Sequence, residues 1–186
     1  MPPPARVLDS PPMPQPQPRP AANPAPRPIA LELDCLAATE RLAQRLAGLA
    51  RPGDVFALTG ALGTGKTAFA RAFVRALTAS EEEVPSPTFT LVQVYEGRSG
   101  PIYHFDLYRV RSEAEAWELG IEEAFAHGIS LIEWPERLGA LLPKGRLELR
   151  FAQVPGAEEA RRVELVAADG WSERLHALGL DQGAAG

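Results

Sequence analysis

Apolar positions in the chain repeat first with a period of two and then with a helical period. Within residues 29–33 every second side chain is large and apolar, which predicts an edge strand. Leu42, Leu46 and Leu49 then lie at positions i, i+4 and i+7 of residues 36–49, a spacing that places them on one face of a helix. The two patterns predict a strand followed by an amphipathic helix.

An unbroken apolar run at residues 55–59 is followed by a second helical stretch at 68–77, and the sequence G-x-x-x-x-G-K-T stands between them. Its glycines let the backbone curl so that successive N–H groups face an anion. The following helix adds its unpaired first-turn N–H groups and the positive end of its dipole. Strand, loop and helix in this order are the context that a phosphate-binding loop requires. The residues expected to contact the nucleotide are Gly60, Ala61, Leu62, Gly63, Thr64, Gly65, Lys66, Thr67 and Ala68.

Lys66 and Thr67 end the motif and carry its chemistry. The lysine can reach the β- and γ-phosphates, and the threonine hydroxyl is placed to ligate Mg²⁺. Only two of the 19 basic residues are lysines, so the composition strongly favours arginine. A lysine nevertheless stands in the loop, where a compact cation suits phosphate better than a guanidinium fork. The motif therefore predicts a nucleoside triphosphate site rather than a glycine-rich turn with an exposed lysine.

The remainder of the chain predicts strands and short helices that complete one sheet. Residues 84–96 begin with two prolines that disfavour a helix and continue with strand formers. A turn at 97–100 and a strand at 101–108 follow, so a hairpin is expected. The fold class is α/β, a single P-loop NTPase-like domain with a mixed central sheet flanked by helices. The other expected elements are a helix capped at Ser112 with Glu115 reaching back, a short helix at 119–125, a buried strand at 129–132, antiparallel-type strands at 146–153 and 161–166, and a helix at 171–178.

Two carboxylates stand at the ends of predicted strands and are candidates for the acidic partner of the loop. Glu133 follows the largely apolar residues 129–132, as the acid of a Walker B element does, and Asp106 lies near the end of the strand at 101–108. Such an acid holds Mg²⁺, directly or through water, or orients the attacking water. Periodicity leaves open which residue has which role. Lys66, Asp106 and Glu133 are the predicted catalytic residues.

Three further positions have two interpretations each. The stretch Ser86-Pro87-Thr88 is either a switch-like loop that senses the γ-phosphate or a proline-stiffened strand entry. His104 and Asp106 have the H-x-D spacing of a metal pair, but two ligands do not make a site, and a hydrogen-bonded structural histidine is favoured. Trp134, beside Glu133, is either core filling or a stacking platform.

Composition divides the chain into three parts. The first 28 residues carry 12 of the 19 prolines and almost no large apolar side chains, so they are predicted to be disordered. We therefore expect a proline-rich extension at 1–28, an ATPase domain at 29–180 and a flexible tail at 181–186. The extension lacks the apolar core of a secretory signal, and no apolar run in the chain is long enough for a transmembrane helix.

Charge and cysteine content limit the function classes. The net charge of −5 argues against a large nucleic-acid footprint on this chain. The single cysteine, Cys35, fits a reducing cytosol and is expected to be a small core residue. Common GTPases read guanine with N-K-x-D or T-K-x-D, and the one lysine outside the loop, Lys144, does not stand in such a motif. ATP is favoured by elimination.

These motifs in this order resemble the TsaE family (formerly YjeE), bacterial P-loop ATPases of tRNA threonylcarbamoyladenosine biosynthesis. H-x-D-L-Y-R at 104–109 and E-W-P-E at 133–136 are far more specific than the P-loop itself. The resemblance covers about residues 31–166, while the proline-rich head and the tail after Asp169 depart from it. The matching stretches are residues 60–67, 86–89, 104–109, 119–123 and 132–136.

The resemblance implies roles for several residues and names partners. Thr67 and Glu133 would hold Mg²⁺, Asp106 would lie near the γ-phosphate and support hydrolysis, residues 86–89 with Thr88 would form a nucleotide-responsive switch, and Trp134 would lie beside the site. The implied cofactors are ATP and Mg²⁺. The implied partners are TsaB and TsaD, of which TsaD transfers a threonylcarbamoyl group to adenosine 37 of tRNA. Hydrolysis is implied to reset that complex in the cytoplasm, with tRNA contacted only indirectly and no membrane involved.

Two other functions stay open on the sequence alone. Small-molecule kinases share the strand, loop and helix, but they usually carry an arginine-rich lid, and no Arg-x-x-x-Arg segment is evident between the loop helix and Glu133. A nucleotide-dependent switch subunit would bind ATP without needing to hydrolyse it. Loss of the acidic residues would then leave its function in cells intact.

Overall fold

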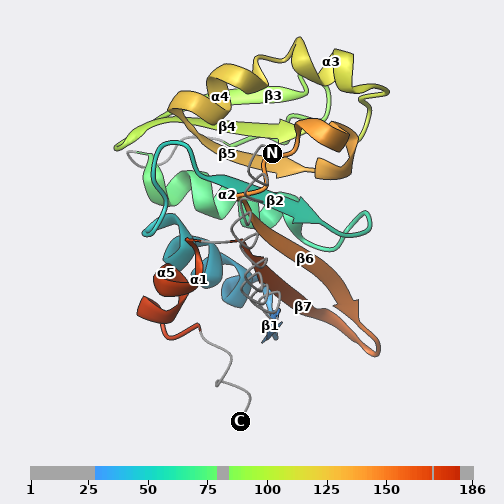
Figure 1. The fold of residues 1–186 in the computed structure, drawn as a ribbon. Coiled ribbons are helices and arrows are strands. Elements are labelled where there is room, and N and C mark those ends of the chain that lie inside the picture. The colour runs from blue at the N-terminus through green and yellow to red at the C-terminus, as the bar shows by residue number, and fades with distance from the viewer. Residues whose placement is uncertain (1–27, 79–83, 169, 181–186) are drawn as a thin grey trace, which may run out of the picture.

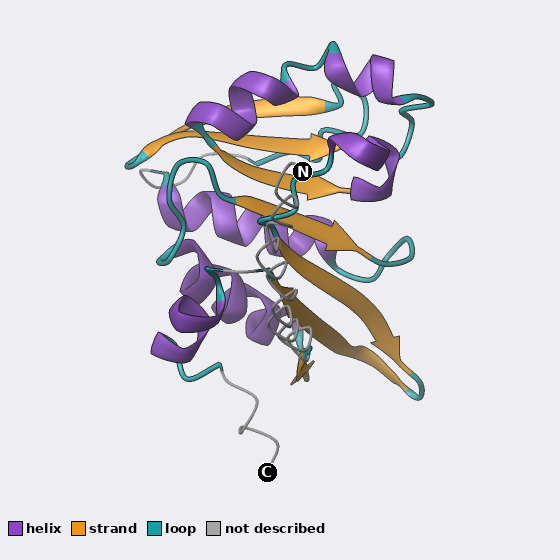
Figure 2. Ribbon diagram, viewed as in Figure 1, coloured by secondary structure: helices purple, strands orange, loops and turns teal. Residues whose placement is uncertain are grey.

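The structure is a computed structural model that describes residues 28–78, 84–168 and 170–180. The expectations for residues 1–28 and 181–186 fall outside this range, apart from Pro28. The described chain forms a seven-stranded sheet with helices on both faces (Figures 1 and 2). The strands are β1 (Ile29–Leu33), β2 (Val55–Thr59), β3 (Val92–Gly97), β4 (Gly100–Asp106), β5 (Ile129–Glu133), β6 (Leu147–Val154) and β7 (Ala157–Ala167). The helices are α1 (Leu36–Ala47), α2 (Lys66–Leu77), α3 (Glu113–Trp117), α4 (Ile121–His127), α5 (Ser172–Ala177) and the 3-10 segment η1 (Pro135–Leu141).

The sheet is mixed in direction, as the sequence predicts, with the order β1-β7-β6-β2-β5-β4-β3. The central strand β2 runs parallel to both β5 and β6, and β4 runs parallel to β5. Strands β3, β7 and β1 pair in the antiparallel direction, so the predicted hairpin and the predicted edge strand are both confirmed. The parallel centre brings the carboxyl ends of β2, β4 and β5 to one edge of the sheet.

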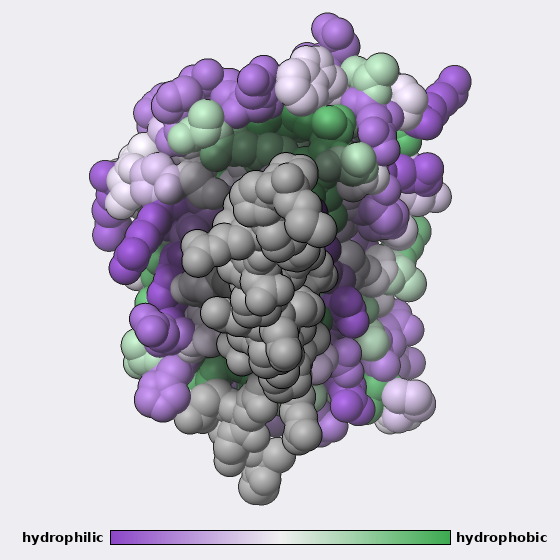
Figure 3. All heavy atoms as spheres, in the orientation of Figure 1, coloured by the Kyte–Doolittle hydropathy of each residue, from purple (hydrophilic) through white to green (hydrophobic). Residues whose placement is uncertain are grey.

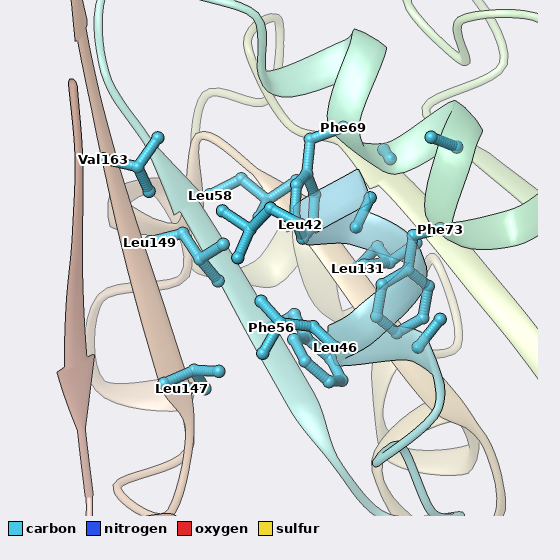
Figure 4. Packing of buried hydrophobic residues seen from close by; sticks show 14 of the residues in the cluster. Leu42, Leu46, Phe56, Leu58, Phe69, Phe73, Leu131, Leu147, Leu149 and Val163 are labelled. Carbon is cyan, nitrogen blue, oxygen red and sulfur yellow. The ribbon is translucent and has the colours of Figure 1, made fainter. Parts of the chain in front are cut away.

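Alternate side chains of the central strands enter two separate cores. Phe56 and Leu58 of β2 pack with α1, α2 and α5 in the larger core, part of which is shown in Figure 4. Val55 belongs to the smaller core with α3, α4 and η1. Because β-strand side chains alternate between faces, one buried strand contributes side chains to the cores on both faces of the sheet. The apolar run of β2 is therefore continuous, as is typical of a parallel strand covered on both sides.

Phe56 is the aromatic centre of the larger core. Its ring centroid lies 4.7 Å from that of Phe73 on α2 and 5.1 Å from that of Trp171. We expect Phe56→Ala to lower the free energy of unfolding by about 3–5 kcal/mol, because the lost contacts leave a cavity in the packed layer. Urea unfolding measures the change. Phe89→Ala is the matched control, since Phe89 is 83% exposed and its loss should change stability little; equal losses in the two variants would contradict this account of the core.

Six large hydrophobic side chains are exposed among the described residues: Leu36, Leu62, Phe89, Val94, Tyr108 and Trp117. In the space-filling view, hydrophilic residues predominate around the rim of the visible face and hydrophobic residues lie between them (Figure 3). Among the described residues, no helix combines the length and the apolar character needed to cross a membrane.

Three sequence expectations need correction. The strand formers that follow the prolines of residues 84–96 form a strand only from Val92, because a turn in which the Leu91 N–H donates to the Pro87 carbonyl at 2.6 Å occupies the preceding residues. Cys35 is half-buried at the start of α1 and not a core residue. Ser112 caps α3 by accepting from the Glu115 N–H, as predicted, but the Glu115 carboxylate accepts from the Arg111 N–H.

Candidate functional site

The glycine-rich loop joins β2 to α2 at the carboxyl edge of the sheet. Gly60, Gly63 and Gly65 have φ values of 135°, 77° and 102°, so the backbone turns through conformations that other residues rarely adopt. Gly65 is the N-cap of α2, and the first turn of the helix therefore follows the loop directly. The N-terminal N–H groups and the dipole of α2 make this end of the helix favourable for an anion.

Gly60 has a second reason to be glycine. A Cβ atom placed there would lie 2.3 Å from the carbonyl oxygen of Phe151 on β6, whereas one placed at Gly63 would have nothing within 4 Å. Gly60→Ala should lower the free energy of unfolding by about 3 kcal/mol or more, since backbone strain and overlap add. Gly63→Ala, the matched control, should lower it by about 1 kcal/mol from the left-handed conformation alone. Chemical denaturation of both variants checks the difference, and equal effects would show that the β6 contact is unimportant.

Lys66 lies inside the loop that it follows. Its ammonium Nζ donates to the carbonyl oxygens of Gly60 at 2.7 Å and Ala61 at 2.8 Å, and it lies 4.3 Å from the ring centroid of Trp134. The residue is only 4% exposed. Burial lowers the pKa of this amine, while the charges of Glu133, Asp106 and Glu136 act in the opposite direction. The loop thus holds a largely dehydrated cation in a fixed position beside the helix end.

Thr67 and Glu133 form the second part of the site. The Thr67 hydroxyl donates to Glu133 Oε2 at 2.8 Å, and the other carboxylate oxygen, Oε1, lies 2.9 Å from Nε2 of His104. Glu133 is 2% exposed and ends β5, the strand next to β2. The residues therefore present two hard oxygen ligands at the start of α2, which is the donor type that Mg²⁺ prefers.

Asp106 lies on the neighbouring strand β4, in register with Glu133. Its Oδ2 accepts from the Thr88 hydroxyl at 2.9 Å, and its Oδ1 accepts from the Tyr108 N–H at 3.1 Å. The Ser86 and Thr88 hydroxyl oxygens are 2.8 Å apart. The segment 86–88 is therefore tied to the acidic residue at the sheet edge and not to a strand.

These groups surround one cavity of about 820 Å³. Most of the predicted site residues line it. Gly60, Ala61 and Thr64 of the loop do not: the carbonyls of Gly60 and Ala61 accept from Lys66, and the Thr64 hydroxyl donates to the Ala61 carbonyl. Among the described residues, no group of three or more His, Cys, Asp or Glu side chains could hold a metal by itself. A metal bound here would need further oxygens, as Mg²⁺ obtains from phosphates and water. The predicted residues in the lining are Leu62, Gly63, Gly65, Lys66, Thr67, Ala68, Thr88, Asp106, Glu133 and Trp134.

Comparison with known families gives this cavity a context. The sequence model of the family "Threonylcarbamoyl adenosine biosynthesis protein TsaE" matches residues 33–163, which contain the loop and both acidic residues. The chain belongs to the TsaE family.

Individual TsaE proteins align over about 60% of the chain. A protein of Rickettsia conorii named "tRNA threonylcarbamoyladenosine biosynthesis protein TsaE" is 41% identical over 113 residues, which is 61% of this chain and 65% of that protein. The chain thus matches slightly less than two thirds of the length of this relative. The protein of the same name from Bacillus subtilis is 40% identical over 112 residues, 60% of this chain and 69% of that protein.

The TsaE assignment agrees with a solved structure. The crystal structure of YdiB from Bacillus subtilis superposes with a TM-score of 0.68 at 27% identity, covering 84% of this chain and 96% of that one. The described domain is therefore a P-loop NTPase-like α/β fold with a mixed sheet, as the sequence predicts.

Several lining residues of this TsaE-family chain were not predicted as site residues. Arg161 on β7 approaches the loop, with Nη2 3.5 Å from the Gly63 carbonyl oxygen, although the two residues are 98 positions apart. Cys35 and Leu36 at the start of α1, Arg71 on α2 and Tyr108 after β4 also line the cavity. No sequence motif marks Arg161, which the sheet order β1-β7-β6-β2 brings toward the loop, whereas Tyr108 belongs to the H-x-D-L-Y-R stretch. The contact between His104 and Glu133 was also missed, although parallel pairing of their strands would have suggested it.

Proposed function

We propose that this chain binds ATP with Mg²⁺ and hydrolyses it to ADP and phosphate. The observation that carries the proposal is the hydrogen bond of 2.8 Å between Thr67 of the loop helix and Glu133 of the adjacent strand. It places a hydroxyl and a carboxylate beside the loop in the arrangement by which P-loop enzymes bind a metal nucleotide. Family membership supports the nucleotide-binding assignment.

Each residue of the site has a chemical task in this proposal. Lys66 and the loop N–H groups bind the β- and γ-phosphates, and Thr67 with Glu133 would hold the metal. Mg²⁺, when bound, neutralises charge on the phosphate oxygens. Asp106 is held by Thr88 and the Tyr108 N–H, so its carboxylate can orient a water molecule toward the terminal phosphate.

We expect slow hydrolysis by the isolated chain from the contacts of three arginines near the site. The Arg109 guanidinium lies 4.6 Å from the ring centroid of the exposed Phe89 and does not line the cavity. Arg71 donates to the Val84 carbonyl and Arg161 to the carbonyls of Glu158 and Ala160. None of these three provides a free cation at the acidic end of the cavity. A P-loop enzyme that lacks such a group runs about 10³- to 10⁵-fold slower.

We also propose the biological process. The relatives are named for tRNA threonylcarbamoyladenosine biosynthesis, and we infer that residues 29–180 act as one ATPase domain in that process, in the cytoplasm, together with TsaB and TsaD. The acidic net charge favours indirect contact with tRNA through these partners. ATP is favoured over GTP because a guanine-reading motif needs a lysine. The one lysine outside the loop, Lys144, is exposed and does not line the cavity.

Phosphate release from Mg-ATP tests the proposal, measured for the chain alone and with purified TsaB and TsaD. We expect a low rate for the chain alone and at least a severalfold rise with both partners, because a partner group would complete the site. ATP binding without hydrolysis under either condition would contradict the proposed enzyme activity. A rate that the partners leave unchanged would contradict the proposed assembly.

A further inference from the structure

His104 is buried in the sheet without being part of the apolar core. It lies on β4 and has no exposed surface. Side chains two apart on a strand share a face, so His104 lies on the same face as Asp106, the face against which α2 packs. The adjacent strand β5 runs parallel and pairs His104 with Leu131, two residues before Glu133. The sheet therefore brings the imidazole to the carboxylate of Glu133 on the face that α2 covers.

The two oxygens of Glu133 are held by two different elements. Thr67 of α2 donates to Oε2, and Nε2 of His104 lies 2.9 Å from Oε1. A carboxylate that accepts one hydrogen bond can rotate about its last bond, whereas one held at both oxygens has a defined plane. The orientation of Glu133 toward Thr67 thus depends on the histidine.

The hydrogen-bond partners indicate which nitrogen of His104 carries the proton. A carboxylate oxygen only accepts, so Nε2 is the donor in this contact. The other nitrogen, Nδ1, is buried and has no hydrogen-bond partner among the described residues. A buried lone pair without a partner is less unfavourable than a buried N–H without one, so the arrangement fits a neutral ring with its proton on Nε2.

We propose that His104 is a positioning residue for the metal nucleotide: its Nε2–H holds Glu133 so that Oε2 faces the Thr67 hydroxyl and the metal position. This inference rests on the proposed function, because it assigns His104 to the Mg²⁺ site of that function. Mg²⁺ requires nearly ideal octahedral geometry, so a freely rotating carboxylate is a poor partner for it. Loss of groups that orient metal ligands typically lowers metal affinity about 10- to 100-fold.

Nucleotide affinity with and without metal tests the role of His104. The full chain is titrated calorimetrically with a non-hydrolysable ATP analogue, once in EDTA and once with saturating Mg²⁺, and the ratio of the two affinities is compared between variants. His104→Gln keeps an N–H donor near the position of Nε2, His104→Asn is too short to reach Glu133, and His104→Leu removes the donor.

We expect His104→Leu and His104→Asn to reduce the Mg²⁺-dependent gain in affinity about 10-fold or more, with little change in EDTA. His104→Gln should retain most of the gain, and in a Glu133→Gln background His104→Leu should have no further effect. If His104→Leu does not fold, the Mg²⁺-dependent gain of His104→Gln is compared with that of His104→Asn. If the role of His104 is purely structural, its loss lowers the affinities with and without Mg²⁺ equally, or His104→Gln loses as much of the gain as His104→Asn. Either result overturns the proposal.

The wild-type chain separates this inference from the function on which it rests. If the wild-type protein binds no ATP analogue in either buffer, the proposed function is wrong and the inference falls with it. If the wild-type protein shows a Mg²⁺-dependent gain that all three His104 variants keep, only the role of His104 is wrong.

Discussion

Replacing Lys66 with alanine is expected to lower kcat/KM for Mg-ATP hydrolysis by about 10²- to 10³-fold. The ammonium is held by the carbonyls of Gly60 and Ala61 beside the Trp134 ring, so a bound nucleotide would meet it in a fixed position. Its burial already lowers its pKa, and an anionic phosphate beside it would favour the charged form. Steady-state phosphate release across a range of ATP concentrations measures the loss.

Two controls make the Lys66 result specific. Lys144→Ala removes the other lysine of the chain, which is exposed and outside the cavity, and should leave kcat/KM unchanged. Lys66→Arg keeps the charge but replaces a compact ammonium with a planar fork, so it should restore little activity. If the arginine variant were as active as the wild type, a fixed single-point contact would not be the reason for the lysine.

Replacing Asp106 with asparagine is expected to lower kcat by about 10²- to 10³-fold while nucleotide affinity changes little. Both carboxylate oxygens accept hydrogen bonds, from Thr88 and from the Tyr108 N–H, and an amide cannot accept at both positions. In the proposed mechanism Asp106 acts in the chemical step rather than in nucleotide binding. Single-turnover hydrolysis together with calorimetric binding distinguishes the two effects.

Glu133→Gln is the matched comparison for Asp106→Asn. Glu133 contacts the Thr67 hydroxyl, so its loss should reduce the Mg²⁺ dependence of binding, which Asp106→Asn should leave intact. In cells, Asp106→Asn also tests the switch-only function. If that variant supported full threonylcarbamoyladenosine levels in tRNA, measured by mass spectrometry, hydrolysis would not be the required activity.

The main elements of the fold follow from local sequence patterns. The continuous apolar run of β2 predicts a central strand covered on both faces, and the alternation in residues 29–33 predicts the edge strand β1. Strand propensity does not show that β3 begins only at Val92, because it cannot detect a turn that depends on the hydrogen bond between Leu91 and Pro87. The sequence patterns do not predict the η1 segment, since its N-cap Trp134 has a left-handed conformation that propensity does not anticipate.

The site was predictable wherever its residues lie in one motif. The loop and the two strand-end acids could be found from spacing, but spacing could not assign the hydrogen-bond partners of the acids. In the structure Glu133 accepts from the Thr67 hydroxyl and Asp106 accepts from the Thr88 hydroxyl. Arg161 could not be found from the sequence, because its approach to Gly63 depends on sheet order. Residues joined by topology alone carry no local signal.

A crystal structure of the chain with Mg²⁺ and a non-hydrolysable ATP analogue would decide whether the loop is the nucleotide site. We expect the β- and γ-phosphate oxygens within hydrogen-bonding distance of Lys66 Nζ, and the metal in contact with Thr67 Oγ1 on the side of Glu133. We also expect Asp106 to face the terminal phosphate without binding the metal. A nucleotide outside the loop, or a metal held by Asp106 and His104, would show that the proposed site is wrong.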